Sequence, residues 1–299
     1  MSEVPGNAPV VVGLDDDGEA GRRAVRWAAH EAALRGRPLH IVHALDWPPV
    51  VDPDPAHATP WEEWRARFRD DGRRLLDGAR ELASAAEPGL AVTGALVDGK
   101  PKTVLTKATA GAALVVLGSR RLSSLQEALT TGGGVAVPVI AHARCPVAVV
   151  RRSGPDRNGA GPVVVGSDGS PGSERAMAYA FEAAVAHGAE VLVVRVCHMP
   201  MTVAGAVAAE AAMRDALAAL EHELARWAEK YPDVMARGEA GFGHPVRVLA
   251  DVSGDALCLV VGTRGLEGFR GMLLGSVGGG LVHHAECPLV VVPGDRDQA

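Results

Sequence analysis

The stretch Val260-Val261-Gly262-Thr263-Arg264-Gly265, followed after nine residues by Gly275-Ser276, decides how this chain is interpreted. Its valines are typical of a buried strand, and the glycines after them have the spacing G-x2-G-x9-G-S. Glycine lets the backbone approach a ligand closely and adopt positive φ angles. A glycine turn between a strand and a helix directs backbone N–H groups to one point, where phosphate binds. Ser276 can cap the helix and offer its hydroxyl to the same anion.

The strand that begins each half of the chain occurs twice. Pro9–Asp15 reads PVVVGLD and Pro162–Asp168 reads PVVVGSD, so the sequence repeats after roughly 150 residues. Short, continuous Val/Leu runs alternate with helical patterns in the same order after both copies. Such runs indicate parallel strands covered on both faces. The pattern therefore predicts an α/β protein with two open sheets, each with a ligand crevice at the carboxyl ends of its strands.

The expected elements follow from the apolar periodicity and from the glycines and prolines that bound it. Strands after the first are expected at 39–44, 90–97, 112–117 and 146–150, and in the second half at 191–196, 235–240, 256–261 and 288–292. Helices are expected at 22–35, 61–86 and 102–110, and at 173–187, 204–230 and 246–252, with one more before each last strand. Residues 151–161 read as a linker.

His284-Ala285-x-Cys287-Pro288 follows the glycine-rich stretch, and the two motifs together closely resemble the ATP-binding motif of the universal stress protein family. The resemblance covers nearly the whole chain. It implies two tandem domains, at residues 8–151 and 162–293. Each is expected to be a doubly wound, open parallel sheet of five strands in the order 3-2-1-4-5, of the adenine-nucleotide alpha-hydrolase-like type.

The same resemblance implies ATP as the ligand of the C-terminal half, with or without Mg²⁺ held by its phosphates. In the family, the acid that matches Asp168 contacts the adenosine part, and the backbone at Gly166 and at the end of the second strand lines the base. The alternative for Asp168 is a turn or N-cap residue before Ser170-Pro171-Gly172. The candidate cofactor-binding residues of this half are Gly166, Asp168, Val194, Val196, Gly262, Thr263, Arg264, Gly265, Gly268, Gly275, Ser276 and Val277.

The N-terminal half departs from the motif. Its corresponding candidates are Gly13, Asp15, Gly118, Ser119 and Arg120. Arg121 stands where the second glycine belongs, and a glycine with positive φ cannot be replaced there without strain. Gly118 and Cys145 are 27 positions apart, against 25 between Gly262 and Cys287, which indicates a two-residue insertion. The extra acid in Asp15-Asp16-Asp17 also disfavours phosphate. This half is expected to bind ATP weakly or not at all.

Composition bounds the remaining possibilities. A net charge of −6 argues against nucleic-acid binding. No apolar run approaches the length of a membrane span, and the N-terminus lacks a signal peptide pattern. Four cysteines without a disulfide spacing favour reduced thiols in the cytoplasm. His142-x2-Cys145 and His284-x2-Cys287 offer two ligands per half where structural zinc needs four, so no metal site is assigned.

The resemblance to the universal stress protein family implies a nucleotide-dependent regulator in a stress or dormancy response, acting on an unidentified protein partner. Nucleotide would order the loop from Gly265 to Gly275. The alternatives are a slow ATP hydrolase or nucleotidyl-transferring enzyme, and a nucleotide-free scaffold. No catalytic residue is assigned, because no general base, magnesium ligand or triad is visible. The apolar fifth strands, at 147–150 and 289–292, are expected to pair either within one chain, as a pseudo-dimer, or between chains, as a homodimer.

Overall fold

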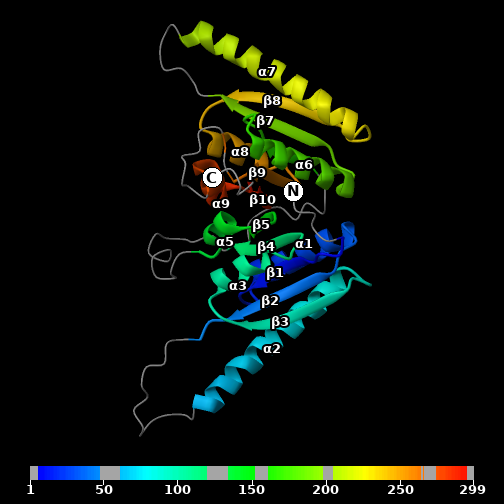
Figure 1. Ribbon diagram of the computed structural model, residues 1–299, viewed down its shortest axis with the longest axis vertical. Helices are drawn as coiled ribbons and strands as arrows, with labels where there is room; N and C mark the ends of the chain where they lie inside the picture. Colours follow the sequence, from blue (N-terminus) through cyan, green and yellow to red (C-terminus); the bar gives the residue numbers. More distant parts are fainter. Residues whose placement is uncertain are drawn as a thin grey trace. The chain divides into compact units, whose positions relative to one another are not determined.

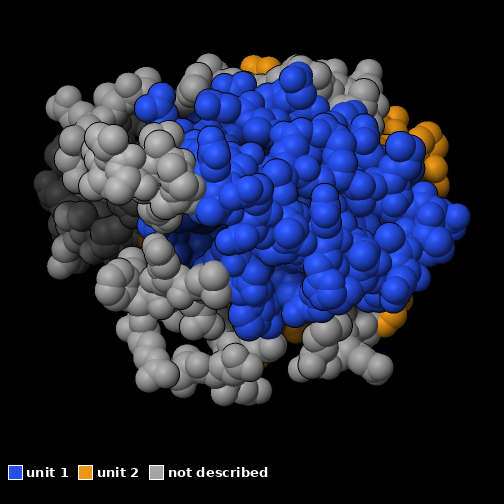
Figure 2. All heavy atoms as spheres, turned by 90° about the horizontal axis from the view of Figure 1, so that it is seen from above, with its two compact units in different colours: residues 1, 140–142, 146–299 blue, residues 2–139, 143–145 orange. Residues whose placement is uncertain are grey.

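The structure is a computed structural model that describes residues 6–47, 61–119, 134–151, 161–197, 205–263, 265 and 274–294. The described residues group into two compact units (Figure 2). The N-terminal unit, orange in Figure 2 and called the first unit below, runs up to Val139 and includes 143–145. The C-terminal unit, blue in Figure 2 and called the second unit below, includes 140–142 and the residues from Pro146 onward. The second unit therefore contains the last strand of the first repeat. Within the described ranges, no helix is both long and apolar enough to span a bilayer.

The first unit is a parallel sheet covered by helices (Figure 1). Its elements are β1 (Val10–Leu14), α1 (Glu19–Leu34), β2 (Leu39–Leu45), α2 (Trp61–Ala86), β3 (Val92–Asp98), α3 (Pro101–Ala108) and β4 (Leu114–Ser119). The strands lie in the order β3-β2-β1-β4, and every neighbouring pair is parallel. The order agrees with the first four strands of the expected 3-2-1-4-5 sheet. Helix α5 (Ala136–His142) follows.

The second unit repeats this arrangement (Figure 1). Its elements are β5 (Val147–Arg151), β6 (Val163–Gly166), α6 (Pro171–His187), β7 (Val191–Cys197), α7 (Gly205–Lys230), β8 (Ala236–Phe242), α8 (Pro245–Ser253), β9 (Cys258–Gly262), α9 (Ser276–His284) and β10 (Leu289–Val292). The parallel strands lie in the order β8-β7-β6-β9-β10, which confirms the 3-2-1-4-5 order for this half. Strand β5 adds to β10 in antiparallel orientation, with Leu289 opposite Val149.

Local sequence explains where the helices begin and end. Gly36 and Gly188 follow α1 and α6 with φ of 60° and 61°, the left-handed conformation that glycine adopts without strain. Pro101 and Pro245 are the first residues of α3 and α8, where a missing N–H costs no hydrogen bond. These boundaries lie within two or three residues of those expected from the sequence.

Two layers of helices enclose the second unit's sheet. Helices α6 and α7 share one face, where Phe181 stacks on Trp227 with ring centroids 5.2 Å apart. Helices α8 and α9 share the other face, because a Cβ added at Gly280 would meet Val246. The strands between them are almost wholly apolar, with Val163, Val165 and Val260 completely buried. Small branched side chains thus form the core, as the low aromatic content implies.

Candidate functional site

Two neighbouring strands of the second unit bring the two parts of the motif together. β6 pairs in parallel with β9, with Val165 opposite Val260, so both strands end at the same edge of the sheet. The residues after β6 lead to Asp168, and the residues after β9 lead to Gly265. A doubly wound sheet binds ligands at this edge.

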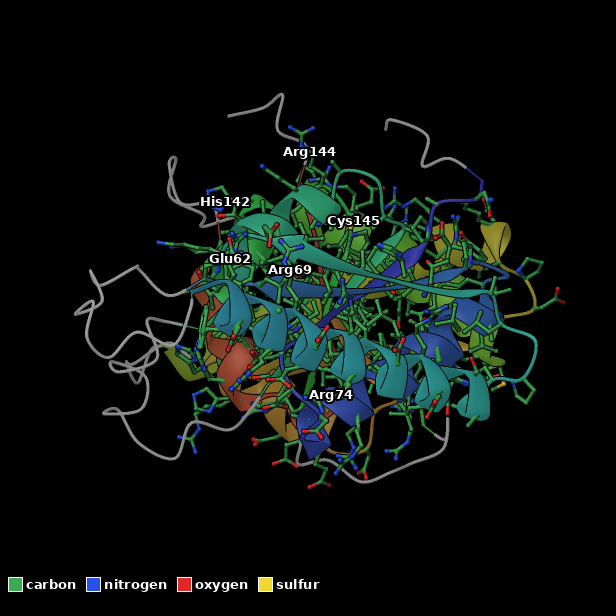
Figure 3. All side chains as sticks on the ribbon, turned by 90° about the horizontal axis from the view of Figure 1, so that it is seen from below. Glu62, Arg69, Arg74, His142, Arg144 and Cys145 are labelled. Carbon is green, nitrogen blue, oxygen red and sulfur yellow. The ribbon has the colours of Figure 1, made fainter. Side chains whose placement is uncertain are left out.

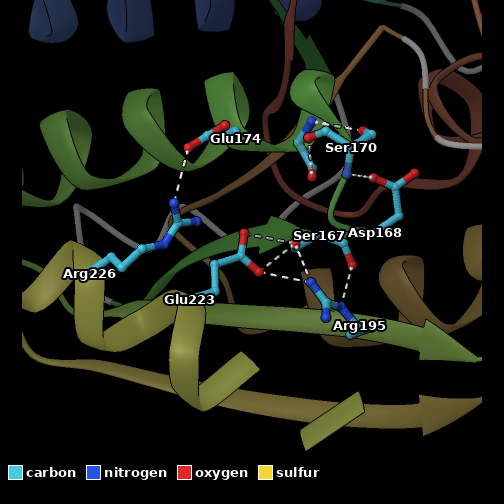
Figure 4. Close-up of polar contacts among 8 residues, drawn as sticks. Ser167, Asp168, Ser170, Glu174, Arg195, Glu223 and Arg226 are labelled. Atoms are coloured by element: carbon cyan, nitrogen blue, oxygen red, sulfur yellow. Dashed lines mark hydrogen bonds and ion pairs between the residues drawn. The ribbon is translucent and has the colours of Figure 1, made fainter. Parts of the chain in front are cut away.

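Asp168 lies in the turn between β6 and α6. Its Oδ1 accepts a hydrogen bond from the Ser170 N–H at 2.9 Å, while Ser170 caps α6 by accepting from the Ser173 N–H at 3.1 Å (Figure 4). Asp168 therefore does stabilise the turn before α6, as the alternative interpretation of this residue expected. The side chain is nonetheless exposed, and its Oδ2 occupies the position that a Cβ on Gly265 would take. One carboxylate thus shapes the turn and faces the glycine stretch.

The glycines of the motif are required for close approach, and the expectation of a positive φ at these positions was wrong. Among the described glycines of this region, Gly169 alone has left-handed backbone, with φ 79°, and Gly275 has φ −70°. A Cβ on Gly262 would lie 2.8 Å from the backbone of Gly172, at the start of α6. A Cβ on Gly265 would collide with Asp168. A side chain at the second glycine position of the motif, which Arg121 takes in the N-terminal half, is therefore disfavoured by steric collision and not by backbone strain.

Thr263 fixes the start of α9 to the end of β9. Its carbonyl accepts from the Gly275 N–H at 2.7 Å, and its own N–H donates to Val292 at 3.0 Å. The Thr263 hydroxyl accepts from the Gly294 N–H at 3.0 Å, so this buried side chain closes the strand ends. Its backbone, held in this way, sets the position of the helix start.

The N-cap of α9 is Gly275, so the expectation that Ser276 caps this helix was wrong. Ser276 is the first helical residue, and its side chain is exposed. The first-turn amides at Ser276, Val277 and Gly278 have no acceptor inside the helix, as at any helix start. Together with the helix dipole, they form the place where an anion is stabilised.

The residues expected to line the base are arranged differently from one another. Gly166 faces α8, because a Cβ there would lie 3.1 Å from Leu249. Val194 is buried, and its carbonyl accepts from the Ser167 N–H at 3.0 Å. Val196 is only half-buried and follows further along β7. Gly166 is the last residue of β6 and Val196 the last but one of β7, so both lie at the carboxyl edge of the sheet.

A polar network beside Asp168 was missed by the sequence analysis. The Ser167 hydroxyl donates to the Glu223 carboxylate, with distances of 3.2 and 3.0 Å to its two oxygens. Arg195 donates from Nη2 to Glu223 at 2.8 Å and to the Ser167 hydroxyl at 3.1 Å, and from Nε to the Ser167 carbonyl at 3.4 Å (Figure 4). The side chains of Arg195 and Glu223 are 15% and 9% exposed, so this is a largely buried ion pair.

In the first unit, the turn after β1 uses a different acid from the one expected. Asp16 Oδ1 accepts from the Gly18 N–H at 3.0 Å, and Gly18 is the N-cap of α1. Asp16 therefore corresponds to Asp168, and the candidate Asp15 is an exposed neighbour. The Asp15-Asp16-Asp17 run is one residue longer than its counterpart in the other half. Counting from the strand therefore aligns Asp15 with Asp168, whereas counting back from the helix N-cap aligns Asp16 with it.

The carboxyl end of β4 keeps part of the motif. A Cβ on Gly118 would lie 3.1 Å from the Ala20 carbonyl, as Gly262 lies against Gly172. Ser119 ends the strand. However, α5 begins six residues before His142, whereas α9 begins eight residues before His284. Pro138 also removes an N–H from the first turn of α5, so this helix start offers fewer donors to an anion.

Some candidates cannot be placed. Arg264, Gly268 and Arg120 lie outside the described residues, as do Arg121 and the remainder of the loop between Gly265 and Leu274.

The His-Ala-x-Cys-Pro motif has a structural role in both halves. The Ser253 hydroxyl accepts from the Glu286 N–H at 2.9 Å, and the Thr109 hydroxyl accepts from the Arg144 N–H at 3.1 Å, so a hydroxyl at the C-terminal end of α8 or α3 holds each turn. His142 and Arg144 are exposed, whereas Cys145 is buried (Figure 3). His284 and Cys287 differ in the same way. A histidine and a cysteine in such different surroundings are poorly placed to share a metal ion.

We expect the two motif cysteines to resist alkylation in the folded protein. Burial raises the pKa of both Cys145 and Cys287 to about 12, so the reactive thiolate is scarce at pH 8. Iodoacetamide at pH 8, followed by peptide mass spectrometry, should modify half-buried Cys197 well before either of them. All four cysteines should react after denaturation. Equal rates for Cys287 and Cys197 in the native protein would contradict the expected burial.

Comparisons with known proteins agree with this architecture. The model of the universal stress protein family matches residues 7–151 and again 160–293. Universal stress protein Rv2005c of Mycobacterium tuberculosis is 36% identical over 94% of this chain and 96% of its own length. Universal stress protein Rv2623 of the same species is 32% identical over 97% and 98%. The crystal structure of a universal stress protein from Archaeoglobus fulgidus shares the fold, with a TM-score of 0.71, 15% identity, and coverage of 99% of this chain and 100% of that one. The chain therefore belongs to the universal stress protein family, with two family segments in tandem.

Proposed function

We propose that the C-terminal half binds ATP and that nucleotide occupancy regulates the protein in a stress or dormancy response. The observation that carries the proposal is the contact between the Asp168 carboxylate and Gly265. Because of it, the acid after β6 and the glycine turn after β9 face one place. A carboxylate there accepts from a ribose hydroxyl or an adenine N–H, and the amides at the start of α9 receive the phosphates.

Two features of the described residues support this ligand. Gly262 packs against the backbone of Gly172, and Gly265 brings its backbone against the Asp168 carboxylate, which a side chain at either position would prevent. The first turn of α9 supplies N–H donors close to the end of β9, because the bond from the Gly275 N–H to the Thr263 carbonyl holds the helix start there. Mg²⁺, where present, would be carried by the phosphates. The proposed response acts through the loop before Gly275 on a protein partner in the cytoplasm.

Nucleotide content and affinity test this function. Protein purified without added nucleotide should release about one ATP per chain on denaturation, and Gly275→Ala should release none. Asp168→Ala should weaken ATP binding in calorimetric titrations by roughly 10- to 100-fold, the loss expected for hydrogen bonds to a charged group. The matched variant Asp16→Ala, in the corresponding turn of the N-terminal half, should leave the measured affinity unchanged.

Other outcomes have definite meanings. Two ATP per chain would show that the N-terminal half also binds. No ATP in the purified protein and none bound on titration would overturn the proposal in favour of a nucleotide-free scaffold. ATP turnover well above background that disappears in Asp168→Ala would instead make the protein a slow hydrolase.

A further inference from the structure

The polar network beneath the Asp168 turn joins three parts of the second unit that are distant in sequence. Ser167 directly follows β6, Arg195 belongs to β7, and Glu223 extends from α7 (Figure 4). Arg195 is held by the short, charge-assisted bond to Glu223 at 2.8 Å, and it donates to both the hydroxyl and the carbonyl of Ser167. The residue that immediately follows the bonded carbonyl is Asp168.

The contact continues into the turn itself. Gly169 has φ 79°, and a Cβ added to it would lie 3.7 Å from Nη2 of Arg195. Arg195 therefore supports the turn from Ser167 to Gly169 on the side of α7. The opposite end of the turn is fixed by the bond from the Ser170 N–H to Asp168. Between these two supports, the carboxylate of Asp168 has one defined direction.

The first unit shows that the fold does not need this network. Leu14, which takes the position of Ser167, is buried and apolar. Ala79 takes the position of Glu223, because Leu76 lies under Gly94 as Leu220 lies under Gly238. His43 replaces Arg195 and reaches only the Leu14 carbonyl, with Nδ1 at 2.9 Å. The same strand order forms without an ion pair, so the network belongs to the half that keeps the complete glycine motif.

We infer that Arg195, anchored by Glu223, is a positioning residue of the nucleotide site that fixes Ser167 and thereby the direction of the Asp168 carboxylate. This inference rests on the proposed binding of ATP. Glu223 has a second part in it, because its charge-assisted bond holds the Arg195 guanidinium beside Ser167.

A double-mutant cycle tests the inference. Arg195→Met with Glu223→Leu removes both charges together, which keeps a buried site folded where a single replacement would leave one charge unpaired. This paired variant should bind adenosine and ATP about tenfold more weakly, the loss expected when a hydrogen bond to a charged group is misdirected. In the Asp168→Ala background, the same pair should produce no further loss, because Arg195 acts through Asp168.

Two controls separate positioning from general damage. Inorganic triphosphate binds without a nucleoside, so its affinity should be the same in wild type and in the paired variant. Arg195→Lys, which retains the charge beside Glu223 but loses the planar fork, should recover part of the adenosine affinity. His43→Leu, at the corresponding place in the other half, should leave nucleotide binding unchanged.

The inference is overturned if the paired variant weakens adenosine binding equally with and without Asp168, or does not weaken it at all. If the wild-type protein binds ATP, either of these results rejects the positioning role of Arg195 but does not contradict the proposed function. A wild-type protein that binds neither adenosine nor ATP removes both the function and the positioning role.

Discussion

Alanine at position 265 should abolish ATP binding while the protein stays folded. Its Cβ would lie 2.3 Å from Oδ2 of Asp168, so this exposed side chain has to rotate away and give up its hydrogen bond from the Ser170 N–H, which costs about 0.5–1.5 kcal/mol. The rotation removes the carboxylate from the ligand, and the added methyl group occupies the backbone surface that the phosphates approach. Losing two hydrogen bonds to charged groups corresponds to an affinity at least about 100-fold lower.

Calorimetric titration with ATP and thermal unfolding of the same preparation measure both parts of this prediction. Gly78→Ala is a suitable control, because Gly78 is an exposed position in α2 with nothing within 4 Å of an added Cβ. It should leave ATP binding unchanged and stabilise the helix by about 0.5–1 kcal/mol. Undiminished ATP affinity in Gly265→Ala would show that the glycine turn does not approach the ligand.

Replacement of Glu223 alone should be among the most destabilising single changes in the second unit. Glu223→Leu removes the carboxylate that pairs with Arg195, whose side chain is only 15% exposed. Removing one member of a buried ion pair costs about 3–5 kcal/mol, because the remaining charge stays desolvated. The free energy of unfolding, measured in guanidinium chloride, should fall by that amount.

The companion variant distinguishes the cause. Adding Arg195→Met to Glu223→Leu removes the stranded charge, and the free energy of unfolding should return to within about 1–2 kcal/mol of wild type. A double variant as unstable as the sum of its two single variants would show that packing, and not the unpaired charge, sets the cost. In the expected outcome, the double variant regains the free energy of unfolding but not the affinity for nucleotide.

The element pattern was predictable because apolar runs and their boundaries are local. Helix α2 has the expected bounds, and the alternation of strands with helices indicated parallel sheets before any strand order was known. The 3-2-1-4-5 order came from the family resemblance. Two expectations failed on backbone detail. The N-cap of α9 is Gly275 because its N–H donates to the Thr263 carbonyl. The motif glycines are required because neighbouring atoms leave no room for a Cβ, and not because their φ angles are positive.

The ion pair could not be predicted for a different reason. Glu223 is separated from Ser167 by 56 residues, and in the sequence of α7 it looks like any charged residue on a solvated helix face. Only the packing of α7 against β7 brings it to Arg195. The sequence alone also could not show whether Asp15 or Asp16 corresponds to Asp168. The hydrogen bond from the N-cap residue Gly18 to Asp16 identifies Asp16.

The antiparallel pairing of β5 with β10 matters for expressing the C-terminal half of the protein alone. Residues 162–293 on their own would end in β10 with one row of N–H and C=O groups uncovered, along a strand of four buried valines and leucines. Exposed apolar edges recruit other strands. The tandem arrangement supplies that neighbour covalently, at an effective concentration independent of expression level. In this chain, the strand that covers the edge of β10 is therefore part of the same polypeptide.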